Sequence, residues 1–164
     1  MARVVLIGLP GSGKSTVAAV VGSQLGVEVC DTDVVIAHRV GSTTADWLRH
    51  VGESVFRVAE FEALRDCVRR DAVVATGGGV VESEDARDLL AHEFTVWLDA
   101  PDEVLAARTS GGDRPLLGTD HEGTIAVLRA RRSPWYEAVA TVRVGASGSV
   151  EDVASRVRHA MVDP

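Results

Sequence analysis

The chain has 164 residues, of which 46% are hydrophobic and 25% are charged, so its length and composition fit one folded domain with a substantial core. Its net charge of −7, without any cluster of arginines, argues against a nucleic-acid surface, and no nucleic-acid partner is expected. It contains no apolar run of the ~20 residues that span a membrane and has no room for a signal peptide before its first strand, so we expect a cytoplasmic protein that contacts no membrane.

Short apolar strands alternate with helices along the chain. Strands are predicted at 2–7, 27–30, 72–76, 94–98 and 140–144. Helices are predicted at 15–25, 34–40, 43–51, 53–70, 84–92, 101–108, 124–138 (interrupted around Pro134) and 150–161. Residues 109–123 are polar, rich in glycine and without periodicity, which indicates a mobile loop. The alternation predicts an α/β fold in one domain over residues 1–164, with a five-stranded parallel sheet sandwiched between helices.

Two further patterns concern the interior of this domain. The helix at 53–70 carries an imperfect apolar stripe that begins with Val55 and Val58, and we expect this stripe to face the core. Phe56 is interpreted as a core residue or a wall of a substrate pocket. Cys30 and Cys67 lack the spacing of a metal or redox site, so two free thiols in a reducing cytosol are expected.

The strongest motif is GLPGSGKS at residues 8–15, followed by Thr16. It fits the P-loop pattern G-x-x-x-x-G-K-[ST] and lies between a predicted strand and a predicted helix, as that motif requires. Its glycines let backbone N–H groups surround a polyphosphate, with Lys14 reaching the β- and γ-phosphates and Ser15 binding Mg²⁺. Lys14 is the only lysine among seventeen basic residues, and it stands where a compact ammonium is needed between phosphates.

Polar residues and glycines follow the second and third predicted strands, where ligands of parallel sheets bind. Asp31 and Asp33 suggest one carboxylate near a metal and one near an acceptor hydroxyl, although either could cap the helix from Val34 instead. The three glycines at 77–79 offer bare N–H groups to an anion or a hydroxyl, with a tight strand–helix connection as the alternative.

Several arginines remain open to two interpretations. Arg57 and Glu60, one helical turn apart, indicate by themselves a surface salt bridge, and Arg132 is equally uninformative alone. Arg114, in the loop at 109–123, could stabilise charge on a transferred phosphoryl group if the loop closes as a lid, or it could simply be solvated.

Taken together, the motifs occur in a specific order: the P-loop, DTD at 31–33, G-E-x-x-F-R-x-x-E at 52–60, GGG at 77–79, RPLL at 114–117 and RSPWY at 132–136. This pattern covers nearly the whole chain and resembles the shikimate kinase family. The resemblance implies a P-loop kinase fold with substrate-binding helices at about 33–60 and a lid at about 109–123. It also implies transfer of the γ-phosphate of ATP, with Mg²⁺, to the 3-hydroxyl of shikimate, giving shikimate 3-phosphate and ADP.

The resemblance also implies roles for individual residues. Catalysis would rest on Lys14, Asp33 and Arg114, with Asp33 orienting or deprotonating the 3-hydroxyl. The nucleotide would be bound by Gly11, Ser12, Gly13, Lys14, Ser15, Thr16, Arg108 and Arg114. Shikimate would be bound by Asp33, Arg57, Glu60, Gly78, Gly79 and Arg132, and the two arginines of this set would clamp its carboxylate. Mg²⁺ would be held by Ser15 and Asp31.

Three other functions share the P-loop core. A gluconate kinase would need neither two arginines directed at one ring carboxylate nor the RPLL lid, and a nucleoside monophosphate kinase would need more basic residues around its acceptor. A nucleotide sensor without transfer would lack one of the catalytic groups. The family often has an isoleucine-phenylalanine pair where this chain has Trp47-Leu48. This difference could reshape the wall of the acceptor pocket. A monomer that binds only ATP and shikimate is expected.

Overall fold

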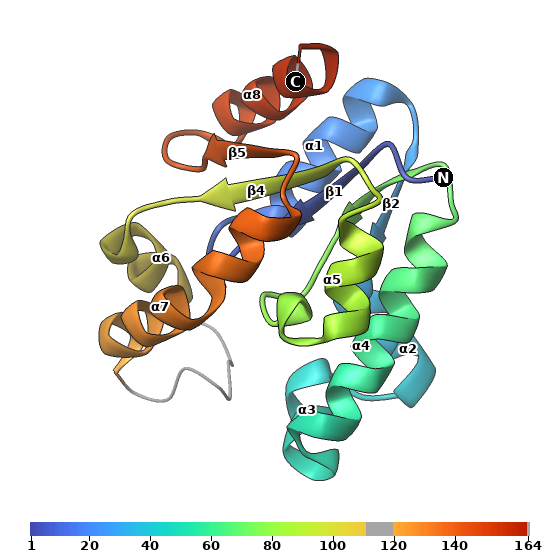
Figure 1. Cartoon of the computed structure of the whole chain (residues 1–164), viewed down its shortest axis with the longest axis vertical. Helices are drawn as coiled ribbons and strands as arrows, with labels where there is room; N and C mark the ends of the chain where they lie inside the picture. The colour runs from blue at the N-terminus through green and yellow to red at the C-terminus, as the bar shows by residue number, and fades with distance from the viewer. Residues whose placement is uncertain (111–119, 164) are drawn as a thin grey trace.

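The computed structural model describes residues 1–110 and 120–163 and places five strands in one sheet (Figure 1). The strands are β1 (Val4–Ile7), β2 (Glu28–Asp31), β3 (Ala72–Ala75), β4 (Thr95–Asp99) and β5 (Val142–Gly145). Their order is β2-β3-β1-β4-β5, and every neighbouring pair is parallel. The predicted five-stranded parallel sheet is therefore confirmed, and its strand ends meet at one edge.

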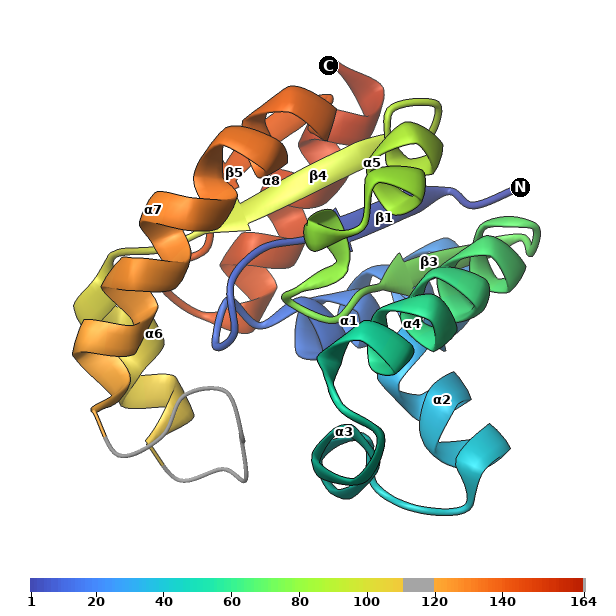
Figure 2. The same cartoon turned by 60° about the horizontal axis from the view of Figure 1, so that its bottom comes forward.

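Helices cover both faces of the sheet (Figures 1 and 2). One face is covered by α1 (Lys14–Leu25) and α8 (Val150–Val162), which pack against each other. The other face carries α4 (Glu53–Val68), the 3₁₀ turn η1 (Val80–Glu82), α5 (Glu84–Leu90) and α7 (His121–Val139). Helix α6 (Asp102–Thr109) packs on α7, while α2 (Thr32–Val40) and α3 (Thr44–Val51) pack on α4.

The predicted interruption of the helix around Pro134 is wrong, because α7 continues through this residue to Val139. Proline removes one N–H donor, which would otherwise bond the carbonyl four residues earlier, at Ala130. Ala130 and Pro134 are both exposed, so water can satisfy that carbonyl without breaking the helix. The short turn η1 was not predicted from the sequence.

The hydrophobic core surrounds β1, whose four residues are fully buried between the helical layers. This burial on both faces explains its uninterrupted apolar run. A second, smaller cluster joins α2 and α4 through Ile36, Phe56 and Ala63, with Trp47 and Leu48 of α3 packed against it.

The predicted inward stripe of α4 is wrong at its start, since Val55 and Val58 are 49% and 61% exposed. The inward face instead carries Phe56, Glu60 and Ala63. A charged residue in the middle of the buried face hides its apolar period, which is why the neighbouring valines appeared to mark the core.

The expectation of two free thiols is also wrong. Cys30, near the end of β2, and Cys67, in the last turn of α4, form a disulfide with a Cα–Cα separation of 5.6 Å. The two cysteines are 37 residues apart in the sequence, and they meet because α4 packs against β3, the strand next to β2. The spacing of the two cysteines in the sequence does not predict this packing.

Candidate functional site

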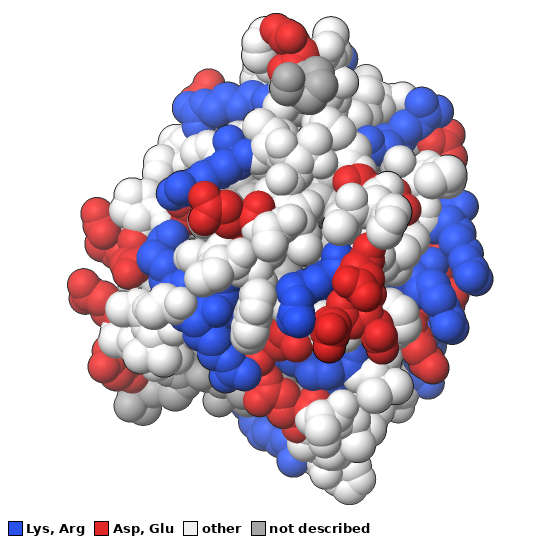
Figure 3. All heavy atoms as spheres, in the orientation of Figure 1, with Lys and Arg blue, Asp and Glu red and all other residues white. Residues whose placement is uncertain are grey.

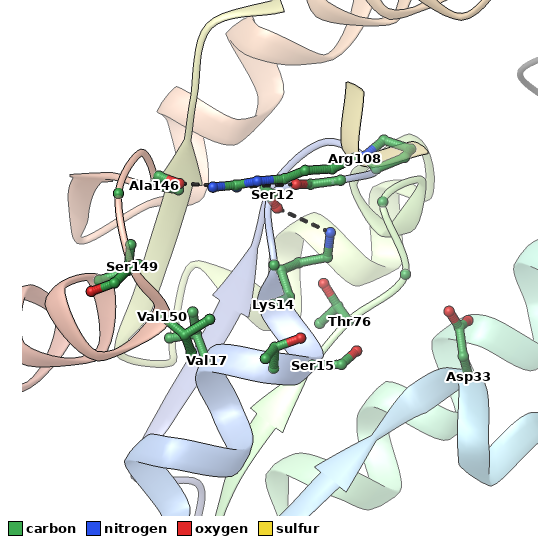
Figure 4. Close-up of a pocket in the computed structure, with 18 residues that line it drawn as sticks. Ser12, Lys14, Ser15, Val17, Asp33, Thr76, Arg108, Ala146, Ser149 and Val150 are labelled. Carbon is green, nitrogen blue, oxygen red and sulfur yellow. Dashed lines mark hydrogen bonds between the residues drawn. The ribbon is translucent and has the colours of Figure 1, made fainter. Parts of the chain in front are cut away.

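A hollow of about 590 Å³ opens at the carboxyl edge of the sheet (Figure 4). The P-loop forms its floor, and its walls come from the start of α2, the residues after β3, Arg108 of α6 and the turn between β5 and α8. Ligands of parallel α/β sheets bind at this edge, where loops from several strands converge. The hollow therefore brings together the predicted segments after β1, β2 and β3 with the turn after β5.

The P-loop has the backbone conformation that its glycines permit. Gly8, Gly11 and Gly13 have φ angles of +147°, +83° and +86°, which residues with a side chain rarely adopt. A Cβ on Gly11 would also lie 2.7 Å from the carbonyl oxygen of Leu105. Helix α1 begins at Lys14, so its unpaired N–H groups and positive dipole end lie at the hollow, an arrangement that suits a phosphate.

Lys14 is buried against the loop that carries it. Its Nζ donates hydrogen bonds to the carbonyl oxygens of Gly8 (2.9 Å) and Leu9 (3.0 Å) and to Oγ of Ser12 (3.3 Å), the last of which Figure 4 shows. The side chain is only 8% exposed, yet it lines the hollow. The protein thus holds its single lysine within the phosphate-sized cradle of the P-loop.

Asp31 connects the P-loop to the start of α2. One carboxylate oxygen accepts a hydrogen bond from the Ser15 hydroxyl at 2.5 Å, and the other accepts from the backbone N–H of Asp33 at 2.9 Å. Asp31 is therefore the N-cap of α2, which begins at Thr32 rather than at Val34. The capping interpretation is confirmed for Asp31, and its role at a metal stays a prediction, while the exposed carboxylate of Asp33 lines the hollow.

The three glycines after β3 leave room for the close approach of neighbouring residues. A Cβ on Gly77 would lie 2.3 Å from Oε1 of Glu60, and one on Gly79 would lie 2.2 Å from Nη2 of Arg57. A Cβ on Gly78 would meet Pro10 of the P-loop at 2.9 Å. The glycine turn, as we call residues 77–79, is thus pressed between the P-loop and charged side chains of α4.

Arg57 and Glu60 form a buried pair on α4, so the surface interpretation is wrong for them. Nη1 of Arg57 donates to Glu60 at 2.5 Å, and their side chains are 13% and 2% exposed. Nη2 of Arg57 donates to Glu53 at 3.1 Å, whereas its buried Nε has no partner among the described residues. Burial raises the pKa of Glu60, against the lowering effect of Arg57, and the nearby Asp33 raises it further.

Arg132 reaches the glycine turn from the other side, out of α7. It is 2% exposed, and it donates through Nε to Glu82 at 2.7 Å and through Nη1 to the carbonyl oxygen of Gly78 at 3.1 Å. The hydroxyl of Tyr136 donates to the same carbonyl at 2.5 Å. Sequence reasoning missed Glu82 and Tyr136, although a glutamate directly after the apolar pair at 80–81 was an available signal.

Arg108 joins the P-loop to the turn after β5. Its Nη1 donates to the carbonyl oxygens of Gly11 (3.3 Å) and Ala146 (3.0 Å) (Figure 4). Arg108 therefore lies at the rim of the hollow, as a residue near the nucleotide would. Arg114 and most of the predicted lid at 109–123 lie outside the described residues.

The site thus contains two adjoining parts. The P-loop with Ser15 and Asp31 offers N–H groups, one ammonium and oxygen ligands, which suits a nucleotide polyphosphate with a divalent cation. The glycine turn, flanked by Arg57 and Arg132, offers guanidinium groups for a small anion. Asp33 is near both parts, because it lines the hollow and interacts electrostatically with Glu60.

Comparison with known proteins agrees with this arrangement. A family model described as shikimate kinase matches residues 10–162. The shikimate kinase of Mycobacterium tuberculosis is 41% identical over 145 residues, which are 87% of this chain and 82% of that protein. The shikimate kinase of Corynebacterium jeikeium is 37% identical over 148 residues, which are 89% of this chain and 80% of that one.

Solved structures are also similar. A shikimate kinase from Acinetobacter baumannii in complex with shikimate superposes with a TM-score of 0.92 at 31% identity, over 97% of this chain and 92% of that one. A shikimate kinase from Aquifex aeolicus superposes with a TM-score of 0.83 at 31% identity, over 99% of this chain and 96% of that one.

Proposed function

The chain belongs to the shikimate kinase family, and from that premise we propose that it transfers the γ-phosphate of ATP to the 3-hydroxyl of shikimate. The products are shikimate 3-phosphate and ADP. One observation carries the acceptor assignment: two largely buried arginines, from α4 and α7, flank the glycine turn directly beside the P-loop. A neutral sugar acceptor would not need these two guanidinium groups.

The acceptor site is built from the side chains around the glycine turn. We propose that Arg57 and Arg132 bind the shikimate carboxylate, since a guanidinium can donate two parallel hydrogen bonds to a carboxylate. Glu60 holds Arg57 in place, and the backbone of Gly78 and Gly79 contributes the wall against which the ring lies. Both arginines are largely buried, so their charges are poorly screened by solvent.

Asp33 is the residue that we propose to orient or deprotonate the 3-hydroxyl. Its carboxylate lines the hollow, near both the P-loop and the acceptor part. Phosphoryl transfer depends chiefly on alignment and on neutralising charge, so Lys14 would move its ammonium from the P-loop carbonyls onto the β- and γ-phosphates. Arg114 is proposed to add a second cation as the lid closes and excludes water.

We further propose that nucleotide binding involves Mg²⁺. The polyphosphate would be bound by the backbone of Gly11, Ser12 and Gly13, by Ser15 and Thr16 at the start of α1, and by Arg108 at the rim. The Ser15 hydroxyl and the Asp31 carboxylate, 2.5 Å apart, are hard oxygen ligands that fit this ion. Mg²⁺ bound to a nucleotide neutralises phosphate charge and takes few ligands from the protein.

The proposed partners are ATP and shikimate, bound by a monomer in the cytoplasm that consists of one P-loop kinase domain. On the face in Figure 3, basic and acidic side chains alternate without a broad basic field of the kind that binds nucleic acid. None of the described helices is both long and apolar enough to cross a membrane.

The decisive experiment measures ADP release from Mg-ATP with shikimate, quinate, gluconate or no acceptor. Turnover with shikimate alone is expected. Turnover with gluconate instead would keep the kinase reaction but contradict shikimate as the acceptor, since gluconate also carries a carboxylate that the two arginines could bind. ATP binding without turnover on any acceptor would contradict the proposed transfer and favour a nucleotide sensor.

A further inference from the structure

Glu82 is a nearly buried carboxylate that lies between two consecutive arginines of α7. It is the last residue of η1, directly after the glycine turn, and its side chain is 7% exposed. Oε1 accepts a hydrogen bond from Nε of Arg132 at 2.7 Å, and Oε2 accepts one from Nη2 of Arg131 at 2.5 Å. Neither the P-loop nor the acceptor clamp described above assigns this glutamate a role.

The two arginines bound by Glu82 differ in their surroundings. Arg131 is 55% exposed, so its ion pair with Glu82 is screened by water and is of little consequence. Arg132 is 2% exposed, and a guanidinium buried to that extent requires a counter-charge and hydrogen-bond acceptors. The interaction that matters for the site is therefore the one with Arg132.

The orientation of Arg132 is determined by contacts at two different nitrogens. Glu82 accepts from Nε, and the Gly78 carbonyl accepts from Nη1. Because the guanidinium group is planar and rigid, two such contacts fix the direction of its remaining donors. Nη2 of Arg132 takes part in neither of these two contacts, so it is the donor left for a ligand carboxylate.

The pairing repeats on the opposite side of the glycine turn. Glu60 binds Arg57 on α4 as Glu82 binds Arg132 on α7, so each arginine of the proposed clamp has its own buried carboxylate. In both pairs the glutamate accepts hydrogen bonds from only some N–H donors of the arginine, so the other donors can bind the carboxylate of the acceptor. Without Glu82, the Arg132 side chain would lose its ion pair at Nε and would be able to rotate away from the turn.

We propose that Glu82 is a positioning residue for the acceptor: it holds Arg132 so that the free edge of the guanidinium meets the carboxylate of a small carboxylated alcohol. This role rests on the proposed function, because it presumes that Arg132 binds the acceptor carboxylate. Glu82 is not among the residues that line the hollow, so it sets acceptor affinity and leaves the chemical step to other residues.

The test compares Glu82→Ala and Glu82→Gln with the wild-type chain in steady-state assays that vary shikimate and ATP separately. Glu82→Ala is expected to raise the KM for shikimate about tenfold, as for the loss of one charge-assisted hydrogen bond, with kcat and the KM for ATP changed less than about twofold. Glu82→Gln is expected to raise it only about threefold, because the amide oxygen can still accept from Nε.

Two controls separate positioning from a merely structural effect. Arg131→Gln removes the other partner of Glu82 and is expected to change the KM for shikimate less than about twofold. In an Arg132→Ala background, Glu82→Ala should cause no further rise, because its effect passes through that arginine. Thermal unfolding of each variant verifies that the chain is folded.

The outcomes distinguish the two proposals. If the wild-type chain phosphorylates shikimate but Glu82→Ala leaves the KM unchanged, or adds a full tenfold rise in the Arg132→Ala background, the positioning role is overturned while the proposed function stands. If the wild-type chain does not phosphorylate shikimate at all, the proposed function is overturned, and the role of Glu82 with it.

Discussion

The hydroxyl of Ser15 and the carboxylate of Asp31 lie 2.5 Å apart, which ties the P-loop to the end of β2. The other oxygen of Asp31 caps α2, the helix whose first turn carries Asp33. The backbone N–H of Gly77 donates to Oγ1 of Thr32, between the two aspartates, at 3.1 Å. The polar segment at residues 31–33 thus fixes the positions of the P-loop, of Asp33 and of the glycine turn relative to one another.

The two contacts of Asp31 can be separated by mutation. Asp31→Asn keeps an oxygen for the α2 cap but removes the negative charge beside Ser15, so we expect the Mg²⁺ concentration for half-maximal activity to rise about tenfold with little loss of stability. Asp31→Ala also removes the cap and should lower the free energy of unfolding by about 1 kcal/mol. Mg²⁺ titrations of activity and urea unfolding measure both effects. Equal stability of the two variants would contradict the capping role.

Asp33→Asn tests the proposed acceptor-activating carboxylate. The amide cannot take a proton or orient a hydroxyl through a charge, so we expect kcat to fall by about 100-fold or more. Calorimetric affinity for an ATP analogue should remain within about twofold of the wild-type value, because the P-loop is unchanged. Asp88→Asn, at an exposed aspartate of α5, is the matched control and should retain full activity. Near-normal kcat in Asp33→Asn would remove Asp33 from the mechanism.

Glu60 should make stability depend on pH. Burial raises its pKa in the folded chain, so the folded state binds the proton more tightly than the unfolded state does. The contribution of Glu60 to the free energy of unfolding is therefore largest at low pH. It falls as the pH rises above the pKa that Glu60 has in the unfolded chain. Urea unfolding between about pH 4 and pH 7 should show that the free energy of unfolding of Glu60→Gln rises relative to that of the wild-type chain as the pH increases.

A control for this dependence lies on the same helix. Glu62 is exposed on α4, and Glu62→Gln should leave the pH dependence of stability unchanged. A constant difference between Glu60→Gln and wild type across the pH range would contradict the raised pKa of Glu60.

The disulfide between Cys30 and Cys67 is expected to contribute strongly to stability. It closes a loop of 37 residues, for which the chain-entropy estimate is about 4 kcal/mol. Urea unfolding with and without a reducing agent measures this difference, and the variant Cys67→Ser should show no dependence on reductant. Two reactive thiols per chain, measured after unfolding without a reducing agent, would contradict the disulfide.

Local sequence determined the fold class and the nucleotide half of the site. Strands that are buried on both faces read as continuous apolar runs, so β1 and β3 were evident, and the glycines around Lys14 belong to a loop whose conformation is set by adjacent residues. The direction of the strands then placed Asp31, Asp33 and the glycine turn at one edge. The family resemblance, and not the local sequence, indicated Arg108, which contacts the P-loop at Gly11, and the nucleotide-binding roles of Arg108 and Arg114 remain predictions.

Only the tertiary structure decided which charged residues are buried and what they contact. Arg57, Glu60 and Arg132 have the local spacing of ordinary surface residues, and only the family resemblance distinguished the arginines. Their burial, the position of Glu82 against Arg132, and the disulfide all depend on how α4 and α7 pack across the sheet. Contacts between residues 37 to 54 positions apart leave no periodic trace in a sequence, because periodicity reports only which side of one element faces inward.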